Sequence, residues 1–128
     1  MYFVSLALAL PLAFVFLGAG RTKLTKSIDD LAAAGMAWAK DIPLSAVRLV
    51  ALLELAGAVG VVAGPLAGIV LGCTRATALG LYAAAGLSLT MLVAAIMHIV
   101  RGEFKYTWKM NLGLLALATI ETVVIAYI

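Results

Sequence analysis

The chain has 128 residues, of which 66% are hydrophobic and only 12% are charged. Its mean hydropathy of +1.18 excludes an ordinary soluble domain of this size. The net charge of +3 comes from nine basic and six acidic residues. We therefore expect an integral membrane protein.

Four stretches are long enough to cross a bilayer, whose apolar core needs about 20 residues of helix. They are residues 2–20, 44–63, 76–100 and 110–128. Backbone groups in lipid must bond within the chain, so each stretch is predicted to be helical. No basic residue precedes the first stretch, which favours a retained helix over a signal peptide. The predicted fold is all-α, an antiparallel transmembrane four-helix bundle that forms one domain over residues 1–128.

Most basic residues lie in two of the three predicted connections. Seven of the nine follow the first and third helices, and the connection on the other side has only Arg75. By the positive-inside rule, these two connections are cytoplasmic and both termini face outward from the plasma membrane. This pattern is typical of lipid head-group anchors and does not favour nucleic acid binding. The seven residues are Arg21, Lys23, Lys26, Lys40, Arg101, Lys105 and Lys109.

The cysteine and histidine counts exclude several cofactors. Cys73 is the single cysteine and His98 is the single histidine. One chain therefore cannot form a disulfide, a Cys-x-x-Cys redox pair or a bis-histidine haem site. No residues show metal-ligand spacing, so neither a metal nor a covalent cofactor is expected.

The connection between the first two helices contains a predicted amphipathic helix. Ser27 is followed three residues later by Asp30, as in a capping box. Small and apolar residues then recur at helical spacing from Ile28 through Gly35 to Trp38. We expect this helix to lie in the membrane interface with Trp38 as its anchor. It either roofs a pocket between the spanning helices or simply packs in the interface.

The second spanning helix carries Glu54 near its middle. A charge there costs about 2.5–3.5 kcal/mol on insertion scales and is tolerated only where it faces protein or water. Glu54 is therefore predicted to point inward. Gly57 and Gly60 leave a bare strip of backbone that a helix or a ligand can approach closely. The pair Gly64-Pro65 is predicted to end this helix.

Further polar residues lie in the predicted spans. Arg48 is long enough to snorkel to the surface, and Asn111 lies one turn inside the fourth helix. His98 either caps its helix at the interface or faces inward with Arg48 and Asn111. Glu121 is about 18 Å deep by helical rise, close to the depth of Glu54. The two carboxylates are expected to form a proton or polar-ligand site, unless Glu121 only bonds helices together or reaches the outer interface.

Three motifs occur in a fixed order along the chain. They are Gly20-Arg21-Thr22-Lys23-Leu24 after the first helix, Glu54-Leu55-Ala56-Gly57-Ala58-Val59-Gly60 in the second, and Met91, Ala95 and His98 before Arg101-Gly102. Together with Asn111, this order resembles the DoxX-like family of four-helix bacterial membrane proteins over nearly the whole chain. The resemblance implies that Lys23, Glu54 and His98 are its polar signature positions.

The resemblance also implies a role in a larger assembly. Named members include small subunits associated with quinone-linked oxidoreductases, such as thiosulfate:quinone oxidoreductase, and others in membrane complexes that handle oxidative stress. Two features depart from the family pattern. Residues 66–72 form a longer apolar stretch than expected, which either dips into the bilayer or extends a helix, and Glu121 matches no family motif.

We therefore expect an accessory subunit of a respiratory or redox membrane complex, and not an enzyme that acts alone. Its pocket is expected to hold a quinone or lipid head group, because His98 when protonated, Arg48 and Asn111 can donate hydrogen bonds to quinone carbonyls. The expected partners are membrane lipids and either a larger complex or further copies of the chain. The predicted ligand-binding residues are Glu54, His98, Arg48, Asn111, Lys23 and Glu121.

Two alternatives from other classes stay open. A dimer could couple proton movement at Glu54 to small-molecule transport, although small multidrug transporters of this length place their carboxylate in the first helix. Glu54 and His98 could also serve as proton donor and acceptor in isomerisation of a lipid or sterol. By depth, however, these two residues are separated by most of a bilayer leaflet.

Overall fold

The structure is a computed structural model that describes residues 1–128. Its four long helices are α1 (Tyr2–Thr25), α3 (Leu44–Leu71), α4 (Thr74–Val100) and α5 (Phe104–Ala126). All four are long and apolar enough to cross a membrane, which confirms the predicted all-α bundle. Two short elements, α2 (Ile28–Ala33) and the 3₁₀ helix η1 (Ala37–Asp41), connect α1 to α3.

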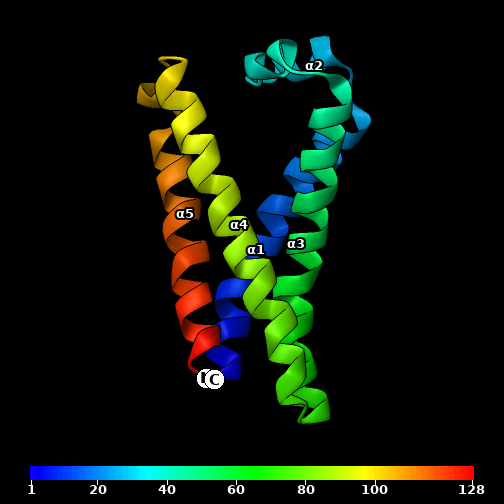
Figure 1. The fold of residues 1–128 in the computed structure, drawn as a ribbon, viewed down its shortest axis with the longest axis vertical. Helices are drawn as coiled ribbons and strands as arrows, with labels where there is room; N and C mark the ends of the chain where they lie inside the picture. Colours follow the sequence, from blue (N-terminus) through cyan, green and yellow to red (C-terminus); the bar gives the residue numbers. More distant parts are fainter.

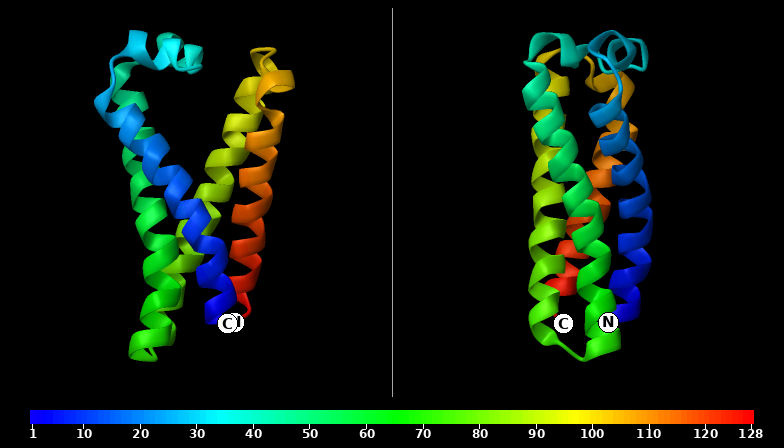
Figure 2. Two further views of the ribbon diagram at one scale, coloured as in Figure 1. Left: turned by 180° about the vertical axis from the view of Figure 1, so that it is seen from behind. Right: turned by 90° about the vertical axis from the view of Figure 1, so that its right-hand side faces the viewer.

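The helices form two pairs that diverge from one end of the molecule. α1 packs along α3, and α4 packs along α5. The pairs lie close together at the end that carries both termini and separate toward α2 (Figures 1 and 2). We call these the narrow end and the wide end. The segment from α2 to η1, residues 28–41, lies across the wide end, and we call it the roof.

α1 and α3 meet along stripes of mostly small residues. Buried residues on α3 recur at alternating steps of four and three from Val47 to Gly68, and those of α1 follow a similar pattern from Ser5 to Lys23. A seven-residue repeat of this kind keeps one face of a helix against its partner. Small side chains allow the close backbone approach that drives helix association in lipid.

Glycines set the contact between α3 and α4. A Cβ atom at Gly64 would lie 2.6 Å from the Cα atom of Gly80, and one at Gly57 would lie 2.6 Å from a methyl carbon of Leu87. Any larger residue at Gly64 must therefore push the two backbones apart. The strip of uncovered backbone predicted beside Glu54 is present. At Gly57 the side chain of Leu87 packs directly against it.

Two predicted helix ends were wrong. The pair Gly64-Pro65 does not end α3, which continues to Leu71 and stops at Gly72, whose φ is +59°. A proline inside a membrane helix is tolerated where neighbouring helices pack around it. Residues 66–71 therefore extend α3. α1 likewise continues past Gly20 to Thr25, because Gly20 packs closely on Leu55 of α3 instead of capping its own helix.

The roof is two short elements where one amphipathic helix was predicted. Gly35, with a φ of +93°, separates α2 from η1. The predicted cap is confirmed, since the backbone N–H of Asp30 donates to the hydroxyl of Ser27 at 3.2 Å. The roof is held to α3 by a small buried cluster formed by Leu31, Ala39 and Val47.

The close contact at Gly64 yields a test of the packing. Gly64→Ala is expected to destabilise the protein by about 1–3 kcal/mol, the usual range for overpacking. Gly113→Ala on α5 is the matched control, because a Cβ there meets no atom within 4 Å. Thermal unfolding in detergent measures both changes. Equal melting temperatures for the two variants would contradict the packing described here.

Candidate functional site

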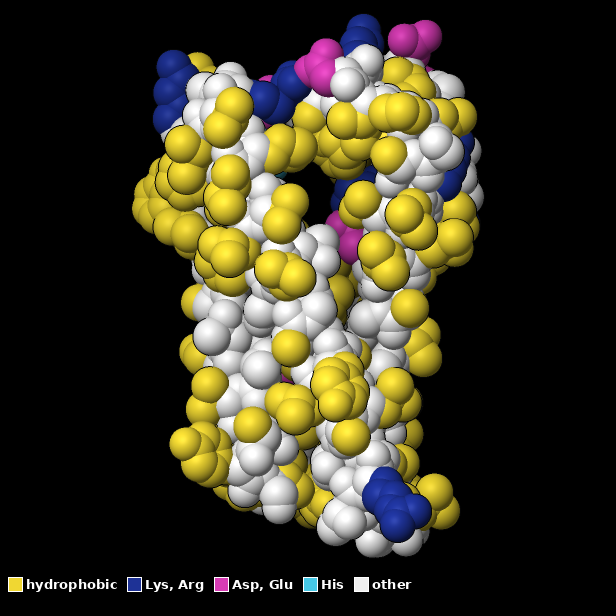
Figure 3. All heavy atoms as spheres, viewed as in Figure 1, with side chains coloured by type: hydrophobic (Ala, Val, Ile, Leu, Met, Phe, Trp, Pro, Cys, Tyr) yellow, Lys and Arg dark blue, Asp and Glu magenta, His cyan; other side chains and the backbone are white.

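A cavity of about 680 Å³ lies between the diverging helix pairs, beneath the roof. Residues of all four long helices and of the roof line it, and 17 of the 24 are hydrophobic. Figure 3 shows the hollow, with acidic and basic side chains at its edge. We call it the roofed chamber. Its roof residues are Ala34, Gly35, Met36 and Trp38, and Ile42 follows directly after the roof.

An ion pair between Lys23 and Glu54 forms one wall of the chamber. The ammonium of Lys23 donates to both carboxylate oxygens of Glu54, each at 2.9 Å. The two side chains are only 10% and 3% exposed, so the predicted inward orientation of Glu54 is confirmed. Lys23 was expected among the cations of the connection, but α1 extends through it and Gly20 brings α1 close to α3. Lys23 and Glu54 together therefore add no net charge to the interior of the bundle.

Arg48 supports this pair from outside the chamber. Its guanidinium donates to the backbone carbonyl of Lys23, which lies in the last turn of α1, where carbonyls lack partners within the helix. Arg48 does not line the chamber. The sequence did not indicate the contact with Lys23, and the snorkelling and ligand-binding roles predicted for Arg48 stay predictions. Arg48 is therefore a positioning residue for Lys23.

Asn111 brings an unpaired polar atom to the chamber. It lies on α5, is 5% exposed, and its side-chain oxygen has no hydrogen-bond partner in the protein. A buried amide left unsatisfied costs about 1–3 kcal/mol. The position of Asn111 on the chamber wall therefore suits a ligand that supplies the missing hydrogen bond.

His98 faces the chamber from the wide end of α4. Its Nδ1 atom lies 3.1 Å from a carboxylate oxygen of Glu103, in the turn between α4 and α5. Nε2 has no hydrogen-bond partner in the protein. His98 therefore faces inward with Asn111, but not with Arg48 as the inward alternative had it, and its second ring nitrogen can meet a ligand.

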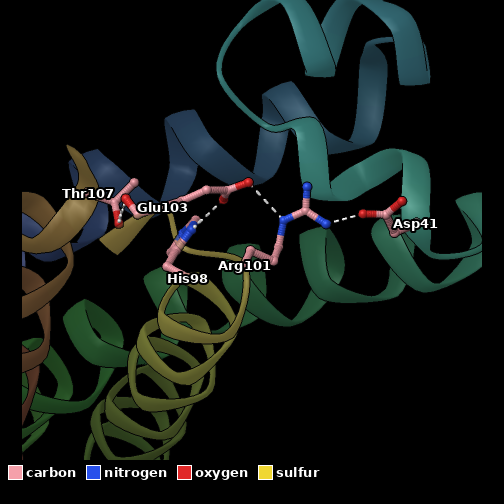
Figure 4. Close-up of polar contacts among 5 residues, drawn as sticks. All are labelled: Asp41, His98, Arg101, Glu103 and Thr107. Atoms are coloured by element: carbon pink, nitrogen blue, oxygen red, sulfur yellow. Dashed lines mark hydrogen bonds and ion pairs between the residues drawn. The ribbon is translucent and has the colours of Figure 1, made fainter. Parts of the chain in front are cut away.

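A chain of polar contacts joins His98 to the roof (Figure 4). Arg101 donates from Nε to Glu103 at 2.8 Å and from Nη1 to Asp41 at the end of η1. We call the contacts among His98, Glu103, Arg101 and Asp41 the roof latch. Hydrogen bonds from Arg101 and then from His98 lower the pKa of Glu103 below its ordinary value. Hydrogen bonds to Asp41 and then to Glu103 raise the pKa of Arg101.

Glu121 lies far from the chamber. It is fully buried, and the hydroxyl of Ser5 donates to one of its carboxylate oxygens at 2.5 Å. Ser5 and Lys23, the partners of the two carboxylates, are 18 residues apart on α1, or about 27 Å along the helix. The expectation that Glu54 and Glu121 share one level was wrong. α5 begins at Phe104 instead of residue 110, which places Glu121 deeper toward the narrow end.

The structure thus brings together four of the six predicted ligand-binding residues and leaves two elsewhere. Sequence reasoning also missed a feature of the chamber wall, which contains four of the five methionines. Flexible thioether side chains adapt to apolar ligands of irregular shape. Three of the four lie within eight residues of His98 or Asn111 in the sequence. This clustering of methionines near predicted site residues is a signal that could have indicated the chamber wall. The four are Met36, Met91, Met97 and Met110.

The buried pair predicts a non-additive pattern of mutations. Lys23→Met is expected to destabilise the protein by about 3–5 kcal/mol, because Glu54 keeps a buried charge without a partner. The double change Lys23→Met with Glu54→Leu is expected to recover most of this loss, since two apolar residues can replace a buried pair. Thermal unfolding of the three proteins in one detergent measures the effect. A double variant less stable than Lys23→Met would contradict it.

The roof latch predicts a pH dependence. Because the pKa of Glu103 is lowered by folding, its contribution to stability is full above its unfolded pKa of about 4.3 and is lost as the pH falls through the lower folded value. Glu103→Gln is expected to melt below wild type at about pH 7, with the difference disappearing toward about pH 3. Asp41 and His98 are the other groups that titrate in the latch, and both are present in the two proteins. A difference that does not change with pH would argue against the latch.

Comparison with known proteins gives a family. The sequence pattern of the DoxX-like family matches residues 7–120. No curated protein and no solved structure matches the chain. The matched region contains Lys23, Glu54, His98 and Asn111, whereas Ser5 and Glu121 fall outside it. This multi-pass membrane protein therefore belongs to the DoxX-like family.

Proposed function

We propose that this protein is a small subunit of a larger membrane assembly and that its roofed chamber holds the head group of a quinone or lipid. The observation that carries the proposal is Asn111, a buried amide that faces a mostly apolar chamber with an unpaired oxygen. The resemblance to subunits of quinone-linked oxidoreductases supports the same choice of ligand.

The polar groups of the chamber suit a head group without net charge. The amide of Asn111 and Nε2 of His98 are free to bond, and the charges of Lys23 and Glu54 already satisfy each other. An amide and an imidazole can each donate or accept. The unpaired oxygen of Asn111 can accept a hydrogen bond from a hydroxyl of a quinol or a lipid head group. The amide NH₂ of Asn111 and Nε2 of His98 can donate to the carbonyl oxygens of a quinone.

A ligand can enter the chamber from the side, between α3 and α4. Leu53, Leu89 and Val93 line the chamber and are also 59%, 61% and 58% exposed. In a membrane helix, such exposed apolar side chains face lipid. The chamber is therefore open to the bilayer, which is where quinones and lipids are dissolved.

The charge distribution supports an orientation in which the wide end is cytoplasmic. Arg75 lies in the first turn of α4 at the narrow end, whereas the other eight basic residues lie toward the roof. By the positive-inside rule, both termini then face outward. The head group would sit in the cytoplasmic half of the membrane.

The ion pair makes proton-coupled transport a weaker candidate. Both oxygens of Glu54 are bonded by Lys23 of the same chain, so no free carboxylate faces the chamber. Lipid isomerisation is the second candidate, because Glu54 and His98 line the same cavity despite their different depths. That chemistry requires Glu54 to exchange its lysine partner for a substrate.

Binding of a short-chain benzoquinone tests the proposed function. Trp38 lines the chamber, so in a Trp108→Phe background its quenching reports occupancy. Asn111→Leu is expected to weaken binding by about tenfold, the equivalent of about 1.4 kcal/mol and of one hydrogen bond. Thr119→Val, on an exposed face of α5, is the control and is expected to bind as wild type does.

Two results would overturn this proposal. One is equal binding by the wild type and by Asn111→Leu. The other is a partner-free, monodisperse protein that carries no amphiphile after purification in mild detergent and shows no saturable quenching.

A further inference from the structure

A second hollow lies on the outer face of the bundle between α3 and α4. Its volume is about 430 Å³, and seven of its ten lining residues are hydrophobic. We call it the α3/α4 groove. Its walls are formed by Leu53, Ala56 and Gly57 of α3 and by residues from Leu79 to Thr90 of α4.

The groove adjoins the roofed chamber. Leu53, Leu89 and Thr90 line both hollows, at the opening through which the chamber meets the bilayer. From Thr90 the groove continues along α4 to Leu79, toward the narrow end. The 11 steps from Leu79 to Thr90 correspond to about 16 Å of helix, or roughly half of the apolar thickness of a bilayer.

The floor of the groove is apolar and kept open by a small residue. A Cβ atom at Gly86 would meet no atom within 4 Å. The hydroxyl of Thr90 donates back to the carbonyl of Gly86 at 2.9 Å, so it is already bonded within its own helix. The groove therefore offers a hydrocarbon chain a surface without an unpaired hydroxyl at this point.

We propose that the α3/α4 groove holds the hydrocarbon tail of the amphiphile whose head group occupies the roofed chamber. This inference rests on the proposed function and adds the class of ligand, a polar head with a long, flexible hydrocarbon tail. The shared rim of the two hollows carries it, because a tail that leaves the chamber past Leu53, Leu89 and Thr90 meets the groove at once.

The position of the tail can be tested separately from binding of the head. The probes are a benzoquinone and a lysophospholipid, each with a photoreactive diazirine in a long tail. In the wild type, labelling is expected to concentrate between Leu79 and Gly86 on the groove wall, as mapped by mass spectrometry of peptides. The probe that labels there identifies whether the ligand is quinone-like or lipid-like.

A matched pair of variants makes the test specific. A Cβ atom at Gly86 or at Gly113 meets no atom within 4 Å, so both backbones accept a side chain. Gly86→Leu is expected to fill the groove, and Gly113→Leu makes the same change on an exposed face of α5. Gly86→Leu is expected to reduce groove labelling to the level found on the outer face of α5, whereas Gly113→Leu leaves it as in wild type. Quenching of Trp38 by a short-chain benzoquinone is expected to be the same in both variants, because neither glycine lines the chamber.

The outcomes separate the two proposals. If Trp38 quenching shows the head group bound but tail labelling is spread evenly over the lipid-facing helices, the groove inference fails and the chamber proposal stands. If Gly86→Leu does not change the labelling, the groove inference also fails. Absence of both quenching and groove labelling overturns the two proposals together.

Discussion

The buried ion pair between Lys23 and Glu54 is the constraint on which the wide end of the molecule depends. Neither charge is stable alone at this depth, so α1 must extend far enough, and lie close enough to α3, for the two side chains to meet. Gly20 provides the close approach, and Arg48 holds the carbonyl of Lys23 from the other side. With their charges mutually satisfied, Lys23 and Glu54 can line a chamber that is otherwise mostly apolar.

The chamber exists because the packing differs between the two ends of the bundle. At the narrow end, glycines such as Gly64 and Gly80 bring α3 and α4 into backbone contact. Toward the wide end the helix pairs diverge, and larger side chains such as Leu53 and Val93 face lipid. Space left between diverging helices must be filled or covered, and here the roof covers it. The polar residues of the site are found where the two helix pairs have separated.

The sequence predicted the spans, the capped connection and the inward carboxylate, because each depends on local composition or on the cost of a charge in lipid. It did not predict the partner of Glu54, since Lys23 looks like other cations that follow a membrane helix. The depth of Glu121 was also wrong, because it depends on where α5 begins, and the helix begins at Phe104 whereas the predicted span began at residue 110. Pairings between helices and exact helix ends depend on tertiary contacts that a periodic pattern does not contain.

The two routes into the chamber bear on the kind of molecule it can receive. Toward the wide end, the roof and its latch from Asp41 to His98 lie between the chamber and the aqueous side. Between α3 and α4, by contrast, exposed apolar side chains form both the rim of the chamber and the start of the groove. A water-soluble ligand would have to displace charged contacts, whereas a molecule already dissolved in the bilayer needs only to move sideways past leucines. The arrangement therefore supports the proposed ligand, a molecule that partitions into lipid and carries a small polar head.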